Sequence, residues 1–352
     1  MIEAEVHEIT VRLSRPLTTT LGSHDALDGV IVSFDDGRDR GWGEATPVPG
    51  FGVHRAPAIA AHLETLAVDV ALNPEDPESL LAAVMNRFDD VAAARFAATG
   101  ALLDLLARRS RRCLSAEVAA RLDVPYRRAV ASGALLSGDE PEEVGAAAEL
   151  AVADGFDTVK LKVGAATLAD DVSRVAAVRS AVGSDVRIRL DANGAWDLEM
   201  ARTAVDALGP FGIDLLEEPT SGLRALEEVA ALVEVPVAVD ESIEDLSDLR
   251  RAADAAPAVI VKPARLGDLV SVTRATLALR APGTRIVVTS LLDGAVARAT
   301  AAVVAAVAGA EGERHGLSTG RLLAADVTDP PWGLSPTVRV DEGSGIGFDP
   351  DL

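Results

Sequence analysis

The sequence predicts an α/β protein in which a (β/α) barrel follows a smaller α+β region. The barrel is predicted because short β-branched runs recur after Pro125, each followed by a polar turn and an alanine-rich segment of helical periodicity. The smaller region is predicted because residues 1–55 are strand-like, whereas residues 56–122 are rich in Ala, Leu and Arg. Hydrophobic residues make up 49% of the chain, which is enough for a large core.

The first elements are expected to form an antiparallel sheet. Residues Ile9–Leu13 alternate between apolar and polar side chains, and Gly29–Phe34 is a β-branched run. The segment Asp35-Asp36-Gly37 lies between that run and Gly41-Trp42-Gly43, which indicates a hairpin turn. Several helices should follow the sheet, because the apolar side chains of Arg95–Arg109 cluster on one side of a helix.

The barrel strands are marked by their last residues, which lie roughly 22 to 29 residues apart, as a strand plus a crossover helix requires. The predicted strand ends are Leu135, Lys162, Asp191, Glu217, Asp240, Lys262 and Thr289. A doubly wound open sheet is the alternative, but no Gly-x-Gly-x-x-Gly phosphate loop follows any of these strands. In a (β/α) barrel the catalytic groups lie at these strand ends.

We expect three parts along the chain. They are an N-terminal α+β domain over residues 1–128, the barrel over residues 129–321, and a C-terminal segment over residues 322–352. The last part is rich in Pro, Gly and Asp, and its run Thr337–Val340 is expected to add a strand to the N-terminal sheet.

Composition narrows the class of protein. The formal net charge of −22 argues against binding to nucleic acid or an anionic membrane, since both require a basic face. The single cysteine, Cys113, cannot form an internal disulfide, and no signal peptide or apolar span of about 20 residues is apparent, so we expect a cytoplasmic protein. The scarcity of lysine beside 55 acidic residues resembles proteins of halophiles that accumulate salt.

Lysine is so rare that each one is a candidate for chemistry. Lys160, Lys162 and Lys262 are the only lysines among 33 basic residues, and a lysine amine, unlike an arginine guanidinium, can be tuned to lose its proton. Lys160 and Lys162 are two residues apart, so on a strand both face the barrel lumen. Repulsion between amines about 6.6 Å apart amounts to about 2.5 kcal/mol at an effective dielectric of about 20. This repulsion predicts that one of the two pKa values falls by about two units, which would make a usable base.

Three consecutive predicted strands end in carboxylates, at Asp191, Glu217 and Asp240. Each closes an apolar run at a similar depth, so the three would converge on one point of the barrel rim, in the oxygen-rich environment that Mg²⁺ prefers. Lys262 follows the next strand, across the lumen from Lys162. A metal that holds a carboxylate between two amines is suited to removing the proton α to that carboxylate.

These motifs resemble the enolase superfamily, in its muconate-lactonizing subgroup. The likeness is carried by the Lys-x-Lys pair, by the strand ends Asp-Ala-Asn-Gly, Glu-Glu-Pro and Asp-Glu-Ser, and by the later Lys-Pro-Ala-Arg-Leu-Gly, and it covers nearly the whole chain. It implies a modified (β/α)8 TIM-like barrel of the (β/α)7β type, capped by the N-terminal α+β domain and the C-terminal tail.

The resemblance also implies a cofactor and its ligands. Asp191, Glu217 and Asp240 would bind Mg²⁺, or Mn²⁺ in its place. Around these ligands the resemblance places three further polar residues, Asn193, Glu218 and Glu241.

The resemblance implies further roles for residues around the metal. Lys162 and Lys262 would form the acid/base pair, as in other members that stabilise an enediolate beside magnesium. Lys160 would tune Lys162 and touch the substrate carboxylate. Additional substrate contacts would come from Thr289, Ser290 and Phe51, and the loops at residues 18–23 and 47–52 would close over the site.

Within this subgroup the sequence is most similar to o-succinylbenzoate synthases, including those with N-acylamino acid racemase activity. Residues 42–50, 262–267 and 315–320 carry that similarity. It implies a lyase of menaquinone biosynthesis in which Lys162 removes the α-proton of a small carboxylate and returns it to the departing hydroxyl. The resemblance also allows a homo-oligomer.

Other activities remain alternatives. A dipeptide epimerase or a muconate cycloisomerase would use the same lysines and metal. An epimerase commonly carries Asp-x-Asp on the eighth strand, where this chain has His315-Gly316-Leu317-Ser318-Thr319. We expect His315 to be a structural or hydrogen-bonding group rather than a base. An inactive barrel would have lost some of the principal residues, and none is lost.

Overall fold

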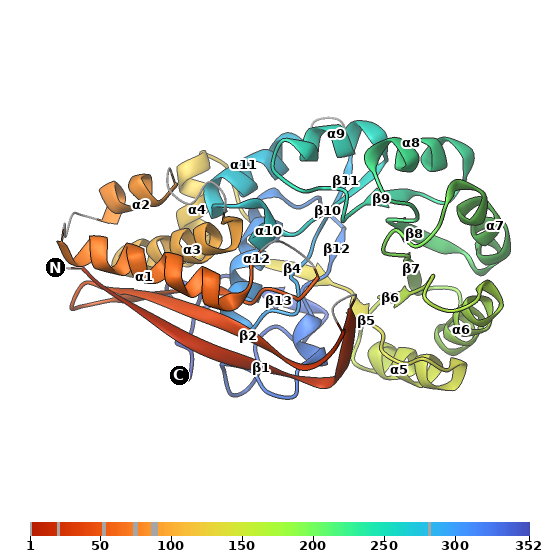
Figure 1. Ribbon diagram of the computed structural model, residues 1–352, viewed down its shortest axis with the longest axis horizontal. Coiled ribbons are helices and arrows are strands. Elements are labelled where there is room, and N and C mark those ends of the chain that lie inside the picture. The colour runs from red at the N-terminus through yellow and green to blue at the C-terminus, as the bar shows by residue number, and fades with distance from the viewer. Residues whose placement is uncertain (1, 20–21, 51–53, 73–76, 86–90, 281–282) are drawn as a thin grey trace.

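The computed structural model describes residues 2–19, 22–50, 54–72, 77–85, 91–280 and 283–352. A cap formed by the first part of the chain lies beside a barrel formed by the second, as the red-to-orange and yellow-to-blue halves of Figure 1 show. Among the helices in those ranges, none combines the length and the apolar character that crossing a membrane requires.

The cap begins with a three-stranded antiparallel sheet. Its strands β1 (Glu3–Thr19), β2 (Gly22–Asp35) and β3 (Arg40–Ala45) lie in chain order. The predicted hairpin turn joins β2 to β3, where the Asp36 side chain accepts hydrogen bonds from the backbone N–H groups of Arg38 (2.8 Å) and Asp39 (2.9 Å). The sequence-based expectation for this sheet is confirmed.

Helices then cover the sheet. They are α1 (Ala56–Leu72), α2 (Pro77–Met85), α3 (Ala92–Arg109) and α4 (Leu114–Leu122). Helix α3 is buried along most of its length and packs against β3. The contact requires glycine, because a Cβ at Gly41 or Gly43 would lie 2.1 Å or 1.9 Å from a backbone oxygen of α3.

The barrel is a parallel sheet whose strands follow one another in chain order. Its strands are β5 (Ala134–Leu135), β6 (Thr158–Lys162), β7 (Arg187–Asp191), β8 (Ile213–Glu217), β9 (Val237–Val239), β10 (Ala258–Val261) and β11 (Arg285–Val288). Every predicted strand end is either the last residue of its strand or the next residue. The helices between and after them are α5 (Pro141–Ala153), α6 (Leu168–Val182), α7 (Leu198–Leu208), α8 (Leu223–Leu232), α9 (Asp248–Ala255), α10 (Pro263–Leu266), α11 (Leu269–Ala278) and α12 (Ala295–Ala308).

A short eighth strand closes the ring. Strand β12 (Arg314–His315) pairs in parallel with β4 (Ala129–Ser132), which leads directly into β5. On one side the N–H of Gly316 donates to the Val288 carbonyl of β11 (2.9 Å). On the other side the His315 carbonyl accepts from the N–H of Gly133 (2.8 Å), so the segment bridges the first and last strands.

The C-terminal segment contacts both parts of the molecule. Its strand β13 (Thr337–Arg339) pairs antiparallel with β4, so the prediction that it would join the N-terminal sheet is wrong. An alternating run specifies a strand but not its partner, and β4 offers the edge that β12 leaves uncovered. Further contacts reach the cap, where Asp349 accepts from Trp42 Nε1 (2.8 Å).

Candidate active site

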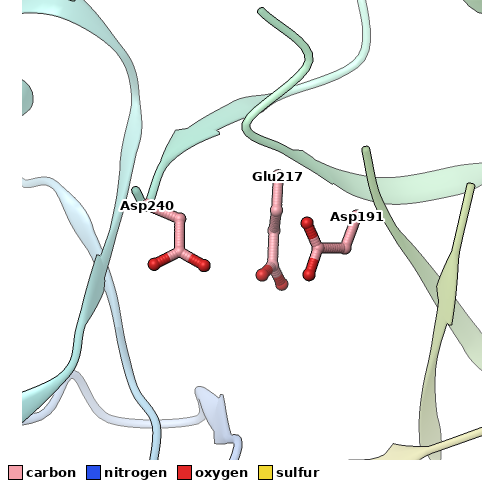
Figure 2. Close-up of side chains that lie close together, drawn as sticks. All are labelled: Asp191, Glu217 and Asp240. Carbon is pink, nitrogen blue, oxygen red and sulfur yellow. The ribbon is translucent and has the colours of Figure 1, made fainter. Parts of the chain in front are cut away.

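Three carboxylates converge where β7, β8 and β9 end (Figure 2). Asp191 and Glu217 are the last residues of paired strands and lie in register, and Asp240 follows β9 directly. One oxygen from each residue lies within 4.8 Å of the other two, and each residue is only 2% exposed. The strand periodicity explains this arrangement, since the ends of neighbouring parallel strands meet at one edge of the sheet.

Two lysine amines lie against these carboxylates. Lys160 Nζ is 2.8 Å from Asp191 Oδ2 and 2.5 Å from Glu217 Oε2. On the other side of the cluster, Lys262 Nζ is 2.7 Å from Asp240 Oδ1. The amines therefore balance part of the buried negative charge.

The pKa of Lys160 is raised, whereas repulsion from Lys162 alone would lower it. Burial by itself would lower the pKa of Lys160, but the nearby charges of Asp191, Glu217 and Asp240 outweigh burial and raise it. The predicted decrease concerned one lysine of the pair, and Lys160 is not that lysine, because its amine lies against carboxylates. Lys162, two residues further along β6, lines the same cavity as Lys160.

The charge balance within the cluster is uneven. Burial raises the pKa of Asp240 to about 8, because the attraction of Lys262 offsets only part of the cost of desolvation. The pKa of Asp191 falls to about 2, since Lys160 and Lys162 more than compensate for its burial. Among the described residues, Asp240 Oδ2 has no hydrogen-bond partner. Buried carboxylate oxygens short of positive charge are the ligands that a hard divalent cation takes, so these three residues could bind such an ion.

Neighbouring polar residues contact the segments that carry two of the three carboxylates, Asp191 and Asp240. Glu218, adjacent to Glu217, turns away from the cluster and accepts hydrogen bonds from the N–H groups of Asp240 (2.6 Å) and Ser242 (3.0 Å). The N–H of Asn193 donates to Asp191 Oδ1 (3.1 Å), and its side chain donates to Glu241 (3.4 Å).

Glu241 links these neighbours to the second amine. Its Oε1 atom also accepts from Lys262 Nζ (2.8 Å). The three residues that we expected around the ligands therefore contact the cluster, its backbone or its lysine.

A cavity extends from the carboxylates to the cap. Thr289 and Ser290, which we expected to contact the substrate, line this cavity, whereas Phe51 lies outside the described residues. Leu17 of β1 and Val48, which follows β3, reach it from the cap. Further lining side chains, which the sequence analysis did not assign to the site, include Leu135, Ile260, Val287, Leu291, Leu292, Ser318 and Thr319.

A buried ion-pair network borders the cavity, which its member Arg189 helps to line. Arg189, only 3% exposed, donates to Asp214 (3.2 Å) and to the Arg314 carbonyl (2.7 Å) and forms an ion pair with Glu313. Arg285 adds a second ion pair to Glu313 (3.0 Å). The sequence analysis missed Arg189, although its place two residues before Asp191 on β7 indicates the lumen.

His315 lies beside this network as a neutral group. Its Nδ1 accepts a hydrogen bond from the N–H of Val288 (3.1 Å), and burial lowers its pKa to about 4. These contacts agree with the structural function that we expected, because a neutral ring whose Nδ1 lone pair is already engaged is a poor base.

Similarity to known proteins identifies the family of this chain. Residues 143–352 match the family described as enolase C-terminal domain-like. The chain belongs to the enolase superfamily. The o-succinylbenzoate synthase of Thermobifida fusca is 38% identical over 226 residues, which span 62% of this superfamily member and 69% of that protein. The hydrophobic dipeptide epimerase of Enterococcus faecalis is 32% identical over 254 residues, which span 70% and 69%.

Solved structures agree with the fold of this enolase-superfamily enzyme. The dipeptide epimerase of Enterococcus faecalis, complexed with Mg and L-Leu-L-Tyr, has a TM-score of 0.85 at 25% identity and covers 98% of this chain and 99% of its own. The muconate lactonizing enzyme of Pseudomonas fluorescens has a TM-score of 0.86 at 23% identity over 99% and 96%. The predicted family and capped TIM-like barrel are therefore confirmed.

Proposed function

We propose that this enzyme is an o-succinylbenzoate synthase, a lyase that forms an aromatic carboxylate by eliminating water. The substrate would be a cyclohexadiene carboxylate with a hydroxyl group next to the α-carbon. Loss of the α-proton gives an enediolate, and loss of the hydroxyl with a returned proton gives water and the aromatic product. The similarity to the Thermobifida fusca enzyme supports this choice.

The cluster of carboxylates supplies the ligands that this reaction requires. Asp191, Glu217 and Asp240 would hold Mg²⁺, whose charge would stabilise the negative charge developing on the substrate carboxylate oxygens. Lys162 on β6 would remove the α-proton and deliver it to the departing hydroxyl on the same face. Lys160, two residues before it, would contact the substrate carboxylate.

Lys262 suits the second function, that of a cation facing the enediolate. Burial would lower its pKa, but the charges of Asp240 and Glu241 raise it, so the amine stays protonated. Its strand, β10, lies on the other side of β7, β8 and β9 from β6, so the two lysines would approach the substrate from opposite sides.

The choice of reaction rests on the side chains that line the cavity wall next to β11 and β12. The described residues that line this wall carry a hydroxyl group, as Thr289, Ser290 and Thr319 do, an imidazole ring or an apolar side chain. None of them carries a carboxylate. The ammonium group of a dipeptide would find no counter-ion there, and desolvating an unpaired charge is costly. A substrate without an ammonium group fits this wall better.

The experiment is turnover of the hydroxycyclohexadiene precursor of o-succinylbenzoate by the purified chain with Mg²⁺, at low and at high salt. We expect product formation that the variants Lys162→Met and Lys262→Met each lose by at least about 10²-fold, the scale of general acid–base catalysis. Racemisation of a dipeptide, without synthase turnover, would instead assign the enzyme to the epimerases.

A further inference from the structure

We propose that Arg174 and Asp171 on helix α6 are positioning residues for Lys162. Together they fix the backbone at the end of β6, and so the point from which the Lys162 amine reaches the substrate. The inference rests on the proposed function of Lys162 as the base. Neither residue touches the cavity, so each would act only through the backbone that carries the lysine.

The end of β6 lacks a strand partner on one side. The carbonyl of Lys160 accepts from the N–H of Leu136 (2.8 Å), at the end of β5. The Lys162 carbonyl lies two residues further on and faces the same side, beyond the last residue of β5. Arg174 Nη1 donates to that carbonyl (3.1 Å) and so replaces the missing strand hydrogen bond.

Asp171 secures the loop that follows. Its Oδ2 accepts from the N–H of Gly164 (2.7 Å), two residues after Lys162, and its Oδ1 accepts from Arg174 Nη1 (3.1 Å). Gly164 has φ +87°, and a Cβ there would lie 2.8 Å from the Ala195 side chain, so both the backbone conformation and the close approach favour glycine at this point of the loop.

Arg174 also ties β6 to the preceding barrel unit. Its Nη2 donates to the carbonyl of Gly138 (3.1 Å), in the loop after β5. Asp171 is 1% exposed and Arg174 is 8% exposed, so removing either partner leaves a buried charge and loosens the loops around Lys162. The hydrogen bonds of Arg174 and Asp171 do not involve Asp191, Glu217 or Asp240, which lie on or directly after β7, β8 and β9.

These contacts predict a specific defect. A displacement of about 1 Å in a reacting group can cost about 10²-fold in rate. Loss of Arg174 should therefore lower kcat by about 10- to 100-fold and make proton removal more rate-limiting, while KM and Mg²⁺ affinity stay close to those of the wild type.

The test compares Arg174→Met, Arg174→Lys and Asp171→Asn with Arg179→Met in the Mg²⁺-loaded enzyme. Arg179 is a matched control on the same helix: it donates to the carbonyls of Phe211 (2.8 Å) and Val186 (2.8 Å), away from the cavity. The measured quantities are kcat per Mg²⁺-binding site, KM, and the primary isotope effect with α-deuterated substrate. We expect a lower kcat and a larger isotope effect for Arg174→Met, partial recovery in Arg174→Lys, an intermediate defect in Asp171→Asn, and wild-type values in Arg179→Met.

Wild-type kcat and isotope effect in Arg174→Met and Asp171→Asn would overturn the inference. So would a lower kcat with an unchanged isotope effect that Arg179→Met reproduces, since that result indicates general destabilisation.

The proposed function fails separately, if Lys162→Met keeps full turnover or the wild type forms no o-succinylbenzoate. In the latter case α-proton exchange in D₂O, with the substrate that the wild type accepts, tests the same four variants.

Discussion

At the scale of single residues, two adjacent glutamates at the end of β8 have different surroundings. Glu217 points into the carboxylate cluster, whereas Glu218 has φ +39° and points to the segment that carries Asp240. Successive side chains of a strand face opposite sides, and the left-handed backbone of Glu218 completes the turn. The motif Glu-Glu-Pro therefore combines a candidate ligand with the residue that orients the next one.

We predict that Glu218→Gln weakens Mg²⁺ binding by about 10- to 100-fold without abolishing it, as outer residues of metal sites do. The glutamine offers one acceptor oxygen in place of two, so an N–H of Asp240 or Ser242 loses its partner. Isothermal titration calorimetry measures the change. The control is Glu228→Gln on α8, which removes only an exposed ion pair to Arg224, and equal affinities in the two variants would disprove this function of Glu218.

At the scale of elements, the two-residue strand β12 is held by His315. The ring accepts from the backbone of β11 and is buried as a neutral group. Its pKa falls from 6.5 in the unfolded chain to about 4 in the fold, so the unfolded state binds a proton first as the pH decreases. The contribution of His315 to the free energy of unfolding is therefore complete above pH 6.5 and declines as the pH falls toward 4.

We predict that His315 makes the enzyme acid-labile, by up to about 3 kcal/mol across that interval. In His315→Gln the amide oxygen can still accept from Val288, but nothing titrates, so its free energy of unfolding should depend less on pH. Urea denaturation between about pH 7 and pH 5 gives the comparison. Parallel pH dependence of the two proteins would contradict the assignment.

Element ends were predictable because the β-branched runs stop at polar residues with regular spacing. Strand β8, for example, ends at Glu217 as expected, and β9 ends one residue before Asp240. The closing strand β12 was not predictable, since two residues show no periodicity. Grouping of the carboxylates followed from the barrel itself, whereas the contact of Lys160 with them depends on side-chain geometry that the spacing does not contain.

At the scale of the whole molecule, the start of helix α12 joins the cap, the barrel and the C-terminal segment. Glu44 of β3 accepts from the N–H groups of Gly294 (2.6 Å) and Ala297 (3.0 Å). Arg298 is fully buried, pairs with Asp326 (2.5 Å) and donates to the Trp332 carbonyl (2.7 Å). Pairs between such distant segments could not be predicted, because a sequence pattern describes local structure only.

We predict that Arg298→Met destabilises the whole molecule by about 3 to 5 kcal/mol, because Asp326 is left as a buried charge without its partner. Arg250→Met should cost less than about 1 kcal/mol, since the Arg250–Asp254 pair is 64% and 63% exposed. The free energy of unfolding in urea, at constant Mg²⁺, compares the two. Similar losses in both variants would show that burial of the Arg298 pair is unimportant.

The central claim is that a divalent cation binds between Asp191, Glu217 and Asp240. Calorimetric titration of Mg²⁺ into the wild type and into Glu217→Gln tests it most directly, since the variant removes one carboxylate while keeping the shape of the side chain. We predict one Mg²⁺ per wild-type chain and no measurable binding to the variant. Equal stoichiometry and affinity in both proteins would contradict the account.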